Sequence, residues 1–75
     1  MTGDEYSEVI DRLGLSKTGA AKFLRVDETT SRRWSKDQNP IPIPVVMLLR
    51  MMVRHGISPA SVIAHLERNG DLEWE

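Results

Sequence analysis

The sequence predicts an all-α domain of five short helices. Residues that cap helix amino ends recur along the chain, apolar residues follow each of them at helical spacing, and glycine or proline separates the segments. The chain has 75 residues and no cysteine, which favours one domain without disulfides or a cysteine-based metal site. We assign residues 1–70 to this domain and residues 71–75 to an acidic tail.

The first two helices are predicted from signals at their ends. Thr2 and Glu5 have the spacing of a capping box, and Gly14 suits the left-handed position that ends a helix. Ser16 then caps a second helix over residues 17–24, and residues 24–26 remain for the turn after it. The side chains expected to face the core from these helices are Tyr6, Val9, Ile10, Leu13, Ala20, Ala21 and Leu24.

The third helix is expected over residues 28–35. Asp27 precedes it, and its carboxylate can accept hydrogen bonds from the free amides and favour the positive helix end. An extended loop should follow over residues 36–43, because Pro40 and Pro42 each restrict the residue before them.

Two more helices are expected after the loop. Pro44 suits the first turn of a fourth helix that runs to His55 and stops at Gly56. The pair Ser58-Pro59 opens a fifth helix over residues 59–69, with Gly70 as its terminator.

Charge is unevenly distributed along the chain. The net charge is −1, but residues 1–15 sum to −3, residues 16–36 to +4 and residues 37–75 to −2. A basic segment between acidic ends suits a local phosphate-binding face. The alternative is that these charges decorate a solvated surface.

A set of residues in the basic segment matches the pattern of a known protein family without a gap. The matching positions are Leu15, Ser16, Ala21, Leu24, Val26, Thr30, Arg33 and Trp34, with Asp27 in place of the usual capping serine. Residues 15–37 in this way resemble the helix-turn-helix of lambda-repressor-like (Cro/cI, XRE-type) transcriptional regulators. The five expected helices fit that family's bundle, so the resemblance covers nearly the whole chain and implies a helix-turn-helix formed by helices two and three.

Three positions depart from the family pattern. Arg25 stands where the family usually has glycine in the turn, and a positive φ there costs a non-glycine residue about 1 kcal/mol. Ser31 replaces a usual apolar residue that faces the core. Ala20 replaces a usual leucine, and we expect Phe23 to fill the space that Ala20 leaves.

The resemblance implies that the third helix lies in the DNA major groove. Arg33 is the first choice as base reader, because a guanidinium can donate two hydrogen bonds to guanine O6 and N7. Glu28 can accept a hydrogen bond from cytosine N4; alternatively it only stabilises the helix dipole. The expected base-reading residues are Glu28, Thr29, Arg32 and Arg33, and the expected phosphate contacts are Ser16, Lys17, Thr18, Thr30, Lys36 and Asn39.

The fourth helix is apolar almost all round. Its inward-facing residues are expected to be Val45, Leu48, Leu49 and Met52, which leaves other apolar side chains for a partner. The alternative is a central helix surrounded by the other four. The residues expected at a dimer interface are Val46, Met47, Met51, Val53, Leu66 and Trp74.

These observations predict a sequence-specific regulator that binds double-stranded DNA. We expect a homodimeric repressor or autoregulator on a pseudo-palindromic operator, of the phage repressor, antitoxin or anti-CRISPR-associated type. The alternative is a protein-interaction module that retains the fold. We expect no metal site, because His55 and His65 lie ten positions apart with no cysteine or carboxylate clustered near them. We expect no enzyme and no cofactor, because the sequence has no Ser/His/Asp spacing, glycine-rich phosphate loop or pair of carboxylates that would indicate catalysis. With no bilayer-spanning segment or signal peptide expected, the predicted location is cytoplasmic.

Overall fold

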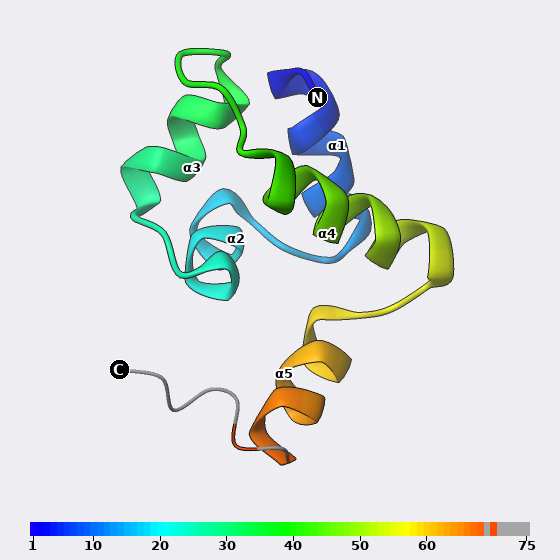
Figure 1. Cartoon of the computed structure of the whole chain (residues 1–75). Coiled ribbons are helices and arrows are strands. Elements are labelled where there is room, and N and C mark those ends of the chain that lie inside the picture. Colours follow the sequence, from blue (N-terminus) through cyan, green and yellow to red (C-terminus); the bar gives the residue numbers. More distant parts are fainter. Residues whose placement is uncertain (69, 71–75) are drawn as a thin grey trace.

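The computed structural model describes residues 1–68 and 70. These residues confirm the predicted all-α class and the order of the helices (Figure 1). The helices are α1 (Gly3–Arg12), α2 (Lys17–Leu24), α3 (Glu28–Ser35), α4 (Ile43–His55) and α5 (Pro59–Arg68). Within the described part of the chain, no helix has both the length and the apolar character needed to cross a membrane.

The starts of α1, α2 and α5 are set by short-range hydrogen bonds that the sequence predicts. The Thr2 hydroxyl accepts a hydrogen bond from the Glu5 amide at 3.2 Å, and the Glu5 carboxylate accepts one from the Thr2 amide. These bonds stabilise the charged carboxylate, and the pKa of Glu5 lies below its usual value chiefly because of the Thr2 amide. Ser16 accepts a hydrogen bond from the Gly19 amide at 2.9 Å, and Ser58 caps α5 in the same way.

The start of α3 differs from the prediction. Asp27 precedes the helix in an extended conformation, but its side chain makes no capping hydrogen bond, so that part of the prediction was wrong. Asp27, Glu28 and Thr29 all lie at the surface, where water can satisfy the free amides in place of the carboxylate.

The helix ends agree with the expected glycine positions. Gly14 and Gly56 follow α1 and α4 with φ of 76° and 64°, in the left-handed region. Arg25 also adopts this conformation, with φ 61° and ψ 40°, at the end of α2. The fourth helix begins at Ile43, one residue before the expected Pro44.

The core lies where α1 meets the other helices. α1 packs against α2, α3 and α4, and α2 packs against α3. The rings of Tyr6 and Trp34 meet edge to face with centroids 5.7 Å apart, beside the buried Ile10, Ala20 and Leu49. This aromatic pair occupies the core next to Ala20, and the expectation that Phe23 fills that space was wrong.

A buried hydrogen bond explains the serine at a core position. Ser31 is fully buried, and its Oγ lies 2.6 Å from the phenol oxygen of Tyr6. Each hydroxyl gives the other a partner, so neither polar group is buried unsatisfied. Burial raises the pKa of Tyr6 above its ordinary value, and the hydrogen bond with Ser31 opposes this shift.

The start of α1 is fastened to the end of α3. Gly3 is buried, and a Cβ atom at this position would collide with the backbone carbonyl of Ser35. The Gly3 amide donates a hydrogen bond of 2.7 Å to the carboxylate of Asp37, whose own φ is 57°. A further ion pair joins Glu5 on α1 to Arg50 on α4 at 3.5 Å.

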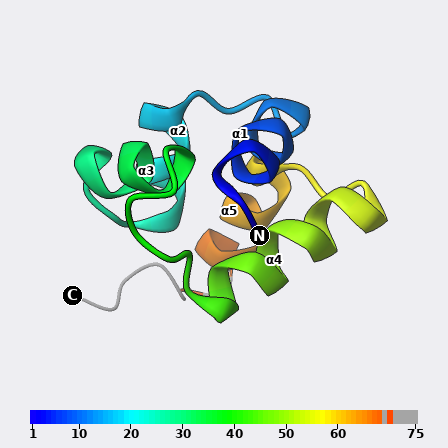
Figure 2. The same cartoon turned by 90° about the horizontal axis from the view of Figure 1, so that it is seen from above.

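The fifth helix is packed much more loosely than the others. α5 contains no buried residue, and Ile63 on it is 38% exposed. Figure 1 shows α5 in orange, apart from the group formed by α1 to α4, and Figure 2 shows it from above, beneath α1 and α4. The compact part of the fold is therefore built by α1 to α4.

Candidate nucleic-acid interface

Helix α3 has one buried and one exposed face. Ser31 and Trp34, three positions apart, point into the core. All of the side chains predicted to read bases lie on the exposed side: Glu28, Thr29, Arg32 and Arg33. The residues that hold α3 in place by packing are therefore different from the residues that α3 exposes to solvent.

Three of the predicted contact residues form one exposed cluster. Glu28 and Arg32, one helical turn apart, make an ion pair, and the Thr18 hydroxyl donates a hydrogen bond of 2.8 Å to the same carboxylate oxygen. The cluster connects the first turn of α3 to the first turn of α2. Since the Glu28 side chain is 44% exposed, this pair contributes little to stability. Its effect is to orient Arg32 toward the amino end of α2.

Arg33 has a different setting. It is exposed, and among the described residues its side chain makes no ion pair or hydrogen bond. Thr29, one turn earlier on the same face, is also exposed. The guanidinium of Arg33 can therefore donate to an external group without first breaking a contact within the described part of the chain.

The predicted phosphate contacts border this face on two sides. Lys17 is exposed at the start of α2 beside Thr18, while the Ser16 hydroxyl is already engaged in capping. Lys36 is exposed at the end of α3. Asn39 and Thr30 are half-buried, so less of each side chain is available.

The residues predicted for a dimer interface are not all accessible. Met47 and Met51 are 66% and 47% exposed, and Val53 and Leu66 are half-buried. Val46 is only 8% exposed, so the prediction that it faces a partner was wrong. It belongs to the stripe, spaced by three residues, that α4 buries within this chain together with Leu49 and Met52. Trp74 lies outside the described residues.

The expected inward residues of α4 are buried to different degrees. Leu49 and Met52 are fully buried, whereas Val45 and Leu48 are half-buried. Among the residues that the structure describes, no three His, Asp or Glu side chains are grouped so that they could hold a metal ion.

Comparison with known protein families, with curated proteins and with solved structures gives no match. The chain is accordingly described by its own geometry: a small five-helix domain in which α2 and α3 pack together and α3 exposes two arginines and a carboxylate.

Proposed function

We propose that this chain is a sequence-specific regulator that binds double-stranded DNA and inserts α3 into the major groove. The observation that carries the proposal is the exposed face of α3. Arg33 is exposed to solvent on this face, and the buried Trp34 anchors the helix in the core. The lambda-repressor-like pattern of residues 15–37 supports it, as does the packing of α2 against α3 across a short turn.

Each polar residue of this face has a distinct role in the proposal. Arg33 donates two hydrogen bonds to guanine O6 and N7. Lys17 and the free amides at the start of α2 bind a backbone phosphate, which sets the position of α3 without reading sequence. Glu28 holds Arg32 near that phosphate, so Arg32 contributes to positioning more than to base choice.

We further propose that two copies bind an inverted repeat and repress transcription by occupying it. Two reading helices related by a two-fold axis would meet half-sites about 34 Å apart. The exposed Met47 and Met51 on α4 support self-association, because methionine adapts well to such contacts.

The test separates base reading from phosphate binding. In a selection from random duplexes, wild-type protein should enrich one sequence. Arg33→Ala should reduce the preference at one base pair by about 10- to 100-fold. Lys17→Ala should weaken all duplexes alike and lower the salt slope by about one.

Arg54→Ala serves as the matched control, because Arg54 is an exposed arginine on α4, away from α3. It should leave both the enriched sequence and the affinity unchanged. Failure to enrich any duplex, or the same enrichment with Arg33→Ala as with wild type, would contradict the proposal.

A protein-interaction module is the second candidate, and the apolar surface of α4 favours it. The side chains of Ile43 and Met47 are 68% and 66% exposed. Large apolar side chains exposed together on one helix are typical of a surface that contacts a partner. Salt discriminates between the two functions. DNA binding should weaken steeply between 50 and 200 mM salt (on the order of 10³-fold for six phosphate contacts), whereas apolar association should not.

A further inference from the structure

The two arginines on the exposed face of α3 differ in their immediate charge partners. Arg32 forms an ion pair with Glu28, one helical turn earlier. Arg33, the next residue, makes no ion pair or hydrogen bond with its side chain among the residues that the structure describes. The Glu28 carboxylate therefore compensates the charge of Arg32 directly and leaves the guanidinium of Arg33 without such a contact.

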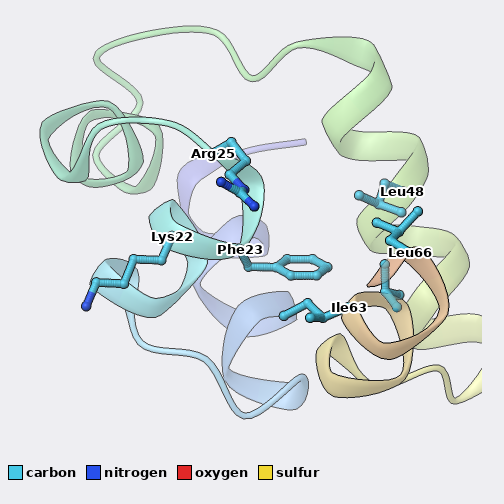
Figure 3. A pocket seen from close by; sticks show the side chains of 7 residues that line it. Lys22, Phe23, Arg25, Leu48, Ile63 and Leu66 are labelled. Carbon is cyan, nitrogen blue, oxygen red and sulfur yellow. The ribbon is translucent and has the colours of Figure 1, made fainter. Parts of the chain in front are cut away.

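The Glu28 carboxylate is also held from a second helix. The Thr18 hydroxyl on α2 donates a hydrogen bond of 2.8 Å to the same oxygen that Arg32 contacts. The position of Thr18 is set by packing, because Ala20 on the same helix is fully buried. Figure 3 shows the Phe23 ring extending from α2 toward α4 and α5, where it lines a groove of about 180 Å³. Packing of α2 thus keeps the carboxylate beside Arg32.

This contact sets how strongly the exposed face of α3 attracts phosphate. The four exposed residues Glu28, Thr29, Arg32 and Arg33 carry one net positive charge, and without the carboxylate they would carry two. A phosphate that approaches Arg32 meets a guanidinium that is already paired and a carboxylate that repels it. Binding to non-specific DNA comes almost entirely from phosphate contacts, so it is the kind of binding that this arrangement weakens most.

We propose that Glu28 is a specificity-determining residue that lowers the affinity of this chain for non-specific DNA by compensating the charge of Arg32. The inference rests on the proposed binding of α3 to DNA. In a specific complex, a cytosine N4 amino group can donate a hydrogen bond to the carboxylate and offset the repulsion. A complex held by phosphates alone supplies no such donor. Glu28 therefore widens the difference between the two affinities, and that difference is the specificity.

The test measures binding to a non-specific duplex by fluorescence anisotropy between 50 and 200 mM salt, beside the duplex that wild-type protein enriches. Glu28→Gln removes the charge and keeps the size of the side chain. It should bind the non-specific duplex more tightly than wild type, with a salt slope steeper by about 0.9, the value for one added phosphate contact. Its advantage should accordingly shrink by about 3.5-fold between the two salt concentrations. On the enriched duplex the gain should be smaller, because the contact to cytosine N4 is weakened.

Glu8→Gln is the matched control. Glu8 forms the same kind of ion pair with Arg12, four positions later on α1, and both side chains are 63% exposed. This variant makes the same change in net charge away from α3 and should leave the salt slope at its wild-type value. A double variant that adds Arg32→Gln to Glu28→Gln should lose the added phosphate contact, which assigns the gain to Arg32.

The possible failures of the two proposals can be told apart. If wild type binds duplex DNA and Glu28→Gln has the same salt slope and non-specific affinity, the role of Glu28 is overturned and the proposed function stands. An equal gain in Glu8→Gln would also overturn that role, because net charge alone would then explain it. So would a gain that survives in the double variant, since Arg32 would not be its source. If wild type binds no duplex at any salt concentration, the proposed function fails and this inference fails with it.

Discussion

Ser31 shows how one residue can look misplaced in a sequence and be satisfied in the fold. A serine on the buried face of a helix suggests a weakened core, and the sequence gives no direct sign of its partner. That partner is Tyr6, 25 positions earlier, whose phenol would otherwise also be buried without a hydrogen bond. Each of the two buried hydroxyl groups therefore depends on the other for its hydrogen bond.

This coupling can be measured with a double-mutant cycle. Ser31→Ala and Tyr6→Phe should each lower the free energy of unfolding by about 1–3 kcal/mol, because each leaves a buried hydroxyl unpaired. The double variant should lose clearly less than the sum of the two, since both polar groups are gone. Urea denaturation followed by circular dichroism gives these values. Strictly additive losses would show that the hydroxyl contact carries no free energy.

Residues that act through close neighbours in the chain could be predicted from the sequence. Thr2 and Ser16 cap helices through amides three positions away, a spacing that can be recognised in the sequence. Arg25 was identified as a positive-φ position from the glycine that the resembling family has there. Asp37 was missed as a structural residue because its partner, Gly3, lies 34 positions away. Its one available signal, an acidic residue soon after a helix, is too common to indicate that contact.

At the level of helices, the most demanding contact is the one between α1 and α3. The amino end of α1 approaches the backbone of α3 so closely that only glycine fits at position 3. Through Asp37 this contact also ties the loop after α3 to α1. The orientation of α3, and with it the direction of its exposed face, therefore depends on the first turn of α1.

Gly3→Ala should disrupt this contact. The added Cβ meets backbone atoms of α3, which cannot rotate away, so α1 must shift. We expect a loss of about 1–3 kcal/mol in the free energy of unfolding, measured by urea titration. Gly19→Ala is the control, because its Cβ meets only the side chains of Ser16 and Leu15 and should change stability by less. Equal effects of the two substitutions would argue against the close approach.

The helix boundaries and the site were predictable to different extents. Glycines and capping residues mark where most helices begin and end, so these follow from the sequence alone. The inward face of α4 was harder to predict, because almost every position from 45 to 53 is apolar and periodicity cannot choose among them. Val46 illustrates this: only packing against the other helices shows that it points inward. The Glu28, Arg32 and Thr18 cluster likewise needs two helices in place.

For the molecule as a whole, the uneven packing of the helices is the main feature. α1 to α4 share a core, while α5 adds no buried residue and leaves apolar surface on α4 exposed. A domain of this size has little stability to spare. Covering that surface, within the chain or between chains, would add to its stability.

Self-association should be visible by analytical ultracentrifugation. If the exposed part of α4 forms a dimer, wild-type protein at micromolar concentration should sediment as two chains. Met47→Lys should shift it to one, because a buried ammonium lacks a partner there. Arg54→Lys, which keeps the charge on the same helix, should leave the dimer intact. A strict monomer, with and without DNA, would rule out the dimer.

The two-faced character of α3 has a consequence for evolution and design. Its buried residues hold the helix, whereas positions 28, 29, 32 and 33 are exposed and support no core contact. Those four positions can be randomised in a library with little loss of folded protein. If α3 recognises DNA as proposed, new recognition properties are accessible through a few codon changes, and a lineage of such chains can diverge in what it binds while its architecture stays fixed.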